Sequence, residues 1–143
     1  MSYLDTKQAL LNQFLATSIT GLTSDDIAFQ NKFFDPANRS LWAAIYFIPA
    51  TSQMMGKTTS DKDEQRGIFQ VSIFVALNND NYDNAQLIAI DEVLAGFQYN
   101  SNTVYNGQQV DILESTVNQG AESESWFQRD ISINYLTFST RGS

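Results

Sequence analysis

Two apolar runs with a polar segment between them decide the fold of this chain: Leu41-Trp42-Ala43-Ala44-Ile45-Tyr46-Phe47-Ile48 and Ile68-Phe69-Gln70-Val71-Ser72-Ile73-Phe74-Val75-Ala76-Leu77. The first run is apolar on both faces and the second is apolar at every odd position, so both patterns predict strands. Residues 49–67 between them have no apolar period. Connections longer than about 12–15 residues are uncommon in compact proteins unless they have a function. We therefore predict a long β-hairpin arm at about residues 49–67.

Apolar residues at helical spacing predict one helix on each side of this hairpin. The first covers residues 3–17, and its apolar stripe comprises Leu4, Leu11 and Leu15, with Ala9, Leu10 and Phe14 beside them. The second covers residues 82–97, and its stripe comprises Leu87, Ile90, Leu94 and Phe97, with Ala89 and Val93 beside them. We expect each helix to pack on a sheet through its stripe.

Patterns of period two predict further strands. Residues 27–33 form a predicted short edge strand, and Asn106-Gly107 indicates a hairpin turn between residues 103–105 and 108–113. In the last strand Arg129 falls on the apolar side, which comprises Phe127, Ile131, Ile133 and Tyr135. The predicted order is α-β-β-β-α-β-β-β. We expect an α+β fold, with residues 1–143 as one domain and two helices packed on one face of a single antiparallel or mixed sheet.

The composition is that of a folded protein with few groups for catalysis. Of 143 residues 43% are hydrophobic, and there is no histidine and no cysteine. This excludes Ser-His-Asp and Cys-His catalysis, imidazole ligands, disulfides and thiolate metal sites. No apolar run approaches the ~20 residues that cross a bilayer, and residues 1–7 do not begin like a signal peptide. We therefore expect neither a membrane protein nor an exported one.

The net charge of −8 is concentrated in the second half of the chain. Residues 1–67 hold seven acidic and six basic residues, a net of −1, whereas residues 68–143 hold nine acidic and two basic residues, a net of −7. Such a surface repels phosphates, and no basic stripe is present to bind nucleic acid by charge. Two interpretations stay open: the acidity keeps the protein soluble, or it lines a passage through which nucleic acid moves without binding.

Some local patterns resemble ligand sites but lack essential residues. Gly56-Lys57-Thr58 would need a glycine where Thr51 stands, and a following helix, to be a phosphate-binding loop. Calcium loops that start at Asp61 or Asp80 lack the required glycine and ligands. A carboxylate pair that acts on a sugar stays an open alternative. The simplest interpretation of the other acidic candidates is solvated charge: Asp91, Glu92, Glu122 and Glu124. We predict no catalytic, cofactor-binding or metal-binding residue.

Met54 and Met55 are adjacent at the expected tip of the arm, where they are exposed unless something covers them. Methionine suits adaptable interfaces because its side chain is flexible and polarisable. Two alternatives stay open for this pair. The side chains fold back onto their own chain, or they contact another subunit or partner protein.

The run Arg66-Gly67-Ile68-Phe69-Gln70-Val71-Ser72-Ile73-Phe74 resembles the R-G-x-x-Q-V-x-V-F strand of tail terminator-like proteins of long-tailed bacteriophages. Two further regions are similar to elements of that family: the helix with Ala85, Ile88, Ala89, Val93 and Phe97, and the closing strands with Gly107, Val110-Asp111-Ile112 and residues 126–135. The resemblance extends from the Leu11-Phe14-Leu15 helix to Tyr135.

The resemblance implies a structural virion protein and not an enzyme. Family members form a six-subunit ring on the head-proximal end of the tail tube, stop polymerisation of the major tail tube protein and offer a surface to the head–tail connector protein. We then expect a location in the virion tail or neck, assembly in the host cytoplasm, no cofactor, and DNA that passes through the ring without specific binding. The alternatives are another phage neck or tail-completion protein, or a small ligand-binding domain or carboxylate-based enzyme.

On this interpretation the arm contacts a neighbouring protomer, because a heterologous ring contact joins two different surfaces. The candidate interface residues are Met54, Met55, Lys57, Asp61, Lys62, Asp63, Glu64 and Arg66.

Overall fold

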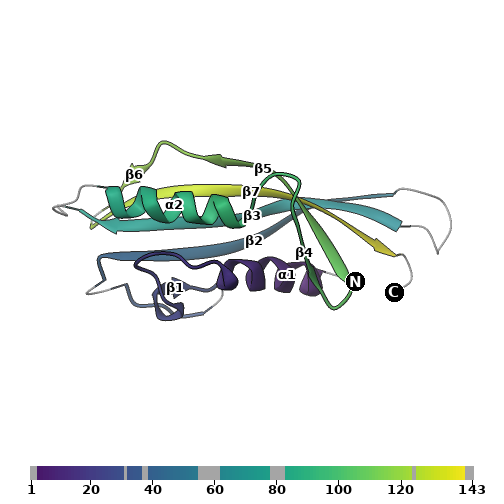
Figure 1. The fold of residues 1–143 in the computed structure, drawn as a ribbon, viewed down its shortest axis with the longest axis horizontal. Helices are drawn as coiled ribbons and strands as arrows, with labels where there is room; N and C mark the ends of the chain where they lie inside the picture. The colour runs from purple at the N-terminus through teal and green to yellow at the C-terminus, as the bar shows by residue number, and fades with distance from the viewer. Residues whose placement is uncertain are drawn as a thin grey trace.

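The computed structural model describes residues 3–30, 32–36, 39–54, 62–77, 83–123 and 125–140, with the backbone alone at residues 3, 24, 50–54, 62–63 and 139–140. In this part of the chain two α-helices, α1 (Tyr3–Ala16) and α2 (Asn84–Gly96), accompany a sheet of seven strands (Figure 1). The strands are β1 (Ile27–Ala28), β2 (Leu41–Met54), β3 (Lys62–Ala76), β4 (Asn102–Tyr105), β5 (Gln108–Val117), β6 (Ala121–Glu122) and β7 (Trp126–Thr140). The α+β class and the predicted order are confirmed, with β6 and a 3-10 turn, η1 (Ser24–Asp26), as additions.

The sheet is mixed, with strand order β1-β2-β3-β7-β5-β4 and with β6 paired to β7. β1 runs parallel to β2, and the other paired strands are antiparallel. The predicted strand over residues 27–33 is wrong beyond Ala28, because Lys32 N donates to the Phe29 carbonyl and turns the chain. The hairpin turn is confirmed: Asn106 and Gly107 have φ of 52° and 81°, and a type I′ turn requires positive φ at both.

Both helices pack on the same face of the sheet. Phe14 of α1 and Phe97, directly after α2, each lie against Phe69 of β3, with ring centroids 6.3 and 5.7 Å apart. Side chains alternate along a strand, so the odd-numbered residues of β3 and β7 share this face. The buried hydrophobic members of the set are Phe69, Val71, Ile73, Val75, Ile131, Ile133 and Tyr135. The core therefore fills the space between this face and the two helices.

The buried side of each helix is rotated away from the predicted stripe. In α1, Leu4 and Leu15 are 68% and 45% exposed, and the buried residues are Thr6, Ala9, Leu10 and Phe14. In α2, Leu87 is 42% exposed whereas Gln86 is fully buried. The prediction is therefore wrong at Leu4, Leu15 and Leu87. Side-chain hydrogen bonds, which hydropathy does not reveal, hold both helices in their rotation: Gln13 of α1 donates to the Gly96 carbonyl, and Gln86 donates to the sheet.

The hairpin arm is confirmed and contains more strand than the sequence suggests. The β2–β3 ladder runs from the Leu41–Val75 pair to the Met54–Asp63 pair. A bulge between Pro49 and Thr51 interrupts it, where proline has no N–H to donate. β7 joins as a third strand and pairs with β3 as far as Lys62–Thr140. Figure 1 shows β3 and β7 continuing past the ends of both helices. Residues 55–61 lie outside the described residues.

Position 67, at the base of the arm, requires glycine because Tyr135 of β7 lies close to its backbone. A Cβ at this position would lie 2.5 Å from Tyr135 Oη, 2.7 Å from Tyr135 Cζ and 2.6 Å from Ile48 O. Tyr135 is buried, and its ring stacks on Phe47 with the centroids 5.7 Å apart. The tyrosine ring thus passes over the glycine of β3 and packs against β2, so it ties three strands together.

Gly67→Ala should lower the free energy of unfolding by about 1–3 kcal/mol, the usual cost of overpacking, because the new methyl group meets a buried ring and a backbone carbonyl. Chemical denaturation measures this loss. Gly107→Asn is the matched control, since this turn glycine has open space around it and asparagine tolerates positive φ. A Gly67→Ala protein as stable as the control would contradict the close approach.

Candidate assembly surface

The structure describes two of the predicted interface residues, Glu64 and Arg66, with their side chains. Three others are described by their backbone alone, and Met54 and Asp63 face each other in the β2–β3 ladder, with Lys62 next to Asp63. The remaining three, Met55, Lys57 and Asp61, lie outside the described residues. The described candidates therefore lie together on the arm, and their contact with a partner stays a prediction.

Glu64 and Arg66 form an ion pair on the face of the sheet opposite the helices. This face, the open face, comprises the even-numbered residues of β3 and β7, together with the even-numbered residues of β2 before the Pro49–Thr51 bulge and Thr51 and Gln53 after it. Arg66 Nε and Nη2 donate to the two carboxylate oxygens of Glu64 at 3.2 and 3.3 Å, and this bond raises the pKa of the guanidinium. Exposed pairs of this kind contribute little to stability. Its effect is to fix one cation and one anion at the base of the arm.

A groove of about 440 Å³ lies beside Arg66, with lining residues from β3, β7 and β5. Its lining includes Arg66 and Ile68 of β3, Leu113 and Glu114 of β5, Asn134 of β7, and Tyr99, which lies between α2 and β4. Asn134 Nδ2 donates to the Glu114 carbonyl at 2.9 Å, next to the bulge between Ile112 and Ser115 that interrupts the β5–β7 ladder. Sequence reasoning missed this groove, because a bulge in β5 leaves no mark in the hydropathy pattern.

Aromatic rings stack across the strands at the other end of the open face. Trp42 of β2 lies parallel to Phe74 of β3 with centroids 3.9 Å apart, and Trp126 of β7 meets Trp42 edge-on at 5.7 Å. Phe34, which precedes β2, stacks on Trp42 at 5.1 Å. The segment before β2 therefore folds over this end of the sheet, which the sequence did not predict.

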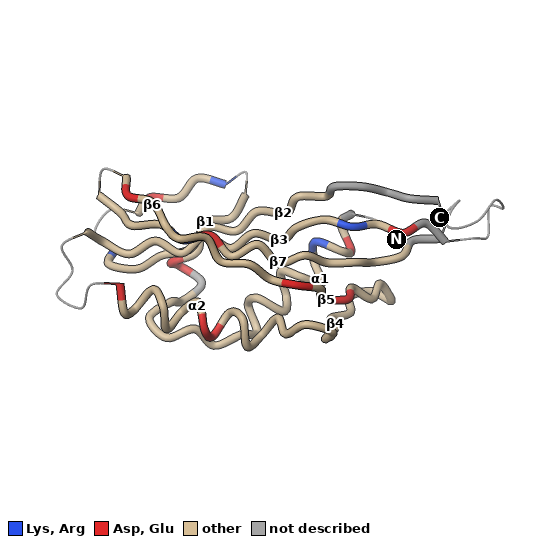
Figure 2. The backbone as a smooth tube through the Cα atoms, turned by 90° about the horizontal axis from the view of Figure 1, so that it is seen from above, with Lys and Arg blue, Asp and Glu red and all other residues tan. Residues whose placement is uncertain are grey.

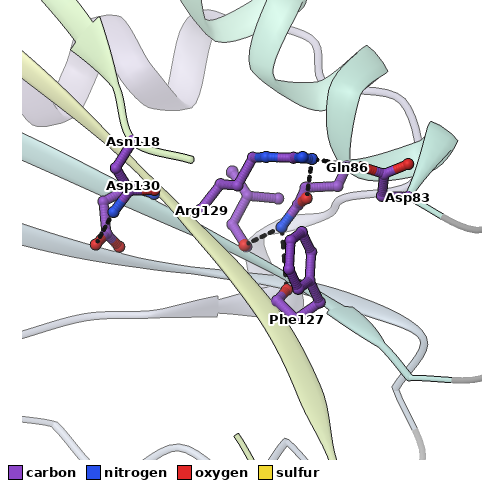
Figure 3. Close-up of polar contacts among 7 residues, drawn as sticks. Asp83, Gln86, Asn118, Phe127, Arg129 and Asp130 are labelled. Atoms are coloured by element: carbon purple, nitrogen blue, oxygen red, sulfur yellow. Dashed lines mark hydrogen bonds and ion pairs between the residues drawn. The ribbon is translucent and has the colours of Figure 1, made fainter. Parts of the chain in front are cut away.

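On the helix side of the sheet, a cluster of hydrogen-bonded polar side chains connects α2 to the sheet (Figure 3). Gln86 Nε2 donates to the carbonyls of Ile73 and Phe127 at 2.8 and 3.0 Å. Arg129 Nη1 donates to Gln86 Oε1 at 2.8 Å and to Asp83 Oδ2 at 2.6 Å. The guanidinium also lies over the Phe127 ring, 4.9 Å from its centroid. The predicted position of Arg129, on the core side of β7, is confirmed.

Asp130, the next residue of β7, points to the open face instead (Figure 3). Its carboxylate accepts hydrogen bonds from Ser72 Oγ at 2.6 Å, Gln128 Nε2 at 2.7 Å and Asn118 Nδ2 at 2.9 Å. These bonds hold the carboxylate in one orientation. They also join β7 to β3 and to the residue that follows β5.

Acidic positions are spread over the described backbone, and basic positions are few (Figure 2). Within the described ranges, no group of three or more His, Cys, Asp or Glu residues is placed to hold a metal ion. None of the described helices has the length and apolar character to cross a membrane. The features that stand out are therefore surfaces: the arm, the groove and the open face.

Over residues 7–135 the sequence matches the family described as phage tail terminator protein. This chain belongs to the phage tail terminator family. A similar solved structure covers 96% of this chain and 96% of its own, with a TM-score of 0.72 and 19% sequence identity. At that identity the likeness shows the fold alone. A search of curated proteins finds no match.

Membership of the terminator family makes this protein a structural component of the phage tail and confirms the predicted family. The matched segment begins in α1 and ends at Tyr135 of β7. It therefore includes Arg66 and the complete lining of the groove. The surfaces described above belong to the part of the chain that defines the family.

The protein should lose stability in acid partly through Asp83. The hydrogen bond from Arg129 holds the pKa of Asp83 below its usual 3.8, against the smaller opposing effect of partial burial. A carboxylate with a lowered folded-state pKa stabilises the fold above its unfolded-state pKa, and this contribution is lost as pH falls through the folded-state value. Because Asp83 is partly exposed, we expect the contribution to stay below about 1 kcal/mol.

Urea denaturation of wild type and Asp83→Asn, compared between about pH 7 and pH 3, measures this contribution. The difference in stability between the two proteins should shrink as the pH falls below about 4. Asp91→Asn, at an exposed position of the same helix, is the control. A pH-independent difference for Asp83→Asn, or the same change for the control, would refute the role of the Arg129 bond.

Proposed function

We propose that this protein forms a ring that caps the head-proximal end of a phage tail tube. The ring ends polymerisation of the major tail tube protein and provides the joining surface for the head–tail connector protein. The match over residues 7–135 supports this proposal, because the family is described as phage tail terminator protein and the match includes nearly all of α1, all of α2 and most of the sheet. The role is structural, and the protein performs no catalysis.

The arm is the proposed contact between neighbouring protomers in a six-subunit ring. The residues proposed for it are Met54, Met55, Lys57, Asp61, Lys62, Asp63, Glu64 and Arg66. Backbone pairing of β2 with β3 as far as Met54 and Asp63 supports this, since the paired ladder carries these two residues away from the helices. An extension on one protomer that meets a different surface on the next produces the heterologous contact that a ring needs.

The ring encloses DNA without binding it specifically. The net charge of −8 supports this part of the proposal, because an acidic lumen repels phosphates and lets a DNA duplex pass. The mature protein is then located in the virion tail or neck, after assembly in the host cytoplasm.

Addition of the purified protein to polymerising tail tubes tests the terminator role. The major tail tube protein of the same phage is polymerised with and without this protein, and tube lengths are measured by electron microscopy. A terminator should shorten the tubes in proportion to its concentration, and density should appear at one end only. Unchanged tube lengths would refute the terminator role and favour another neck or tail-completion function.

Replacement of residues 52–65 by an Asn-Gly turn tests the arm. The Thr51–Arg66 pair can be closed by a two-residue turn, and the pairs from Leu41–Val75 to Pro49–Gly67 remain. The variant should keep its circular dichroism spectrum and lose tube capping. Loss of folding would show that the arm belongs to the core, and full capping by the folded variant would show that the arm is not a contact.

A further inference from the structure

We infer that Phe33 of one protomer docks into the groove beside Arg66 on a second copy of this chain. This inference rests on the proposed ring and names one contact within it. The partner is another copy of the protein, the inserted group is the phenyl ring of Phe33, and the receiving surface is the apolar wall formed by Ile68, Tyr99 and Leu113.

Phe33 is 90% exposed although the next residue, Phe34, is held in place. Phe34 stacks on Trp42, and the Arg39 guanidinium lies over the Phe34 ring, 5.0 Å from its centroid. Arg39 also forms an ion pair with Asp26. A fixed segment that keeps one aromatic side chain in water loses little conformational freedom when a partner covers that side chain. Aromatic residues presented in this way are typical anchors of protein interfaces.

The groove is a receiving surface whose walls are also fixed. Its volume of about 440 Å³ lies within the ~300–1,000 Å³ of ordinary binding pockets, so it admits a phenyl ring together with its flanking residues. Two hydrogen bonds from Arg66 to Glu64 hold one wall. A hydrogen bond from Asn134 to the Glu114 carbonyl holds the other. A groove that is formed before binding requires little rearrangement.

The charges around the two surfaces are complementary. Lys32 precedes Phe33 and is exposed. The groove has Glu114, also exposed, on its β5 wall, whereas Arg66 on its β3 wall is already paired with Glu64. A cation beside an aromatic ring thus meets an anion beside an apolar wall. Such pairing fixes the orientation of a contact and disfavours wrong partners.

The two surfaces are too far apart to meet within one chain. Phe33 adjoins Phe34, which covers the Trp42–Phe74 end of the open face, whereas Ile68 lines the groove six residues earlier in β3. Six residues of strand span roughly 20 Å. The contact therefore joins different surfaces of two copies, which is the heterologous arrangement that closes into a ring.

Self-association of Phe33→Ser is compared with that of wild type and of Leu4→Ser by sedimentation velocity. Leu4 is the matched control because it is 68% exposed and lies on α1, outside both surfaces. Phe33→Ser should weaken association by about tenfold or more, the effect of a truncated interface anchor, and Leu4→Ser should not. Equal association of the two variants would overturn the inference.

Lys32→Glu and Glu114→Lys should each weaken association, and the double exchange should restore it.

Crosslinking gives a second measurement for protein that assembles only on tubes. The native chain has no cysteine, so Lys32→Cys/Glu114→Cys carries the only two thiols, and a short bismaleimide should join protomers into a ladder of covalent oligomers on capped tubes. Lys32→Cys/Leu4→Cys should give no ladder. If wild type caps tubes and no ladder forms, only the Phe33 contact is refuted. If wild type neither associates nor caps tubes, the proposed ring and this contact both fail.

Discussion

The unbroken ladder between β3 and β7 is the constraint on which the rest of the structure depends. It pairs every residue from Ala76–Trp126 to Lys62–Thr140 without a bulge. Because side chains alternate along a strand, this one register assigns each residue of both strands to the core or to the open face. A shift by one residue would bring Ser72 and Asp130 to the core side in place of their apolar neighbours. The position of both helices follows from this assignment.

The strands on either side of this ladder are less regular, and the candidate surfaces lie where they deviate. The Pro49–Thr51 bulge in β2 marks the base of the arm, and the Ile112–Ser115 bulge in β5 lies beside the groove. A bulge bends its strand and disturbs the local ladder, so the surface becomes uneven at that point. The register between β3 and β7 is not changed. The regular β3–β7 pair thus stabilises the sheet, and the bulged strands β2 and β5 beside it shape the candidate surfaces.

The period-two and period-3.6 patterns predicted the fold class and most elements, because burial against one sheet face imposes them. They failed where a polar side chain determines the packing. Gln86 is buried since its amide bonds two sheet carbonyls, and no hydropathy pattern assigns a glutamine to the core. The groove and the Phe34–Trp42 stack also escaped prediction. The groove depends on contacts between segments distant in sequence, and the stack depends on a ring orientation that hydropathy does not show. Of the two candidate residues described with their side chains, Arg66 lines the groove and Glu64 does not.

The groups that stabilise this protein and the groups that face outward are different sets. Tyr135 over Gly67 and Gln86 beneath Arg129 are buried, so their loss would leave gaps or unpaired polar atoms. Arg66 and Phe33 are exposed and Glu64 is half-buried, and an ion pair open to solvent or a lone exposed ring adds little to folding. The fixed positions of Glu64 and Arg66 are therefore not explained by the stability of the single chain. In the proposed ring, this ordered surface meets the next copy of the protein.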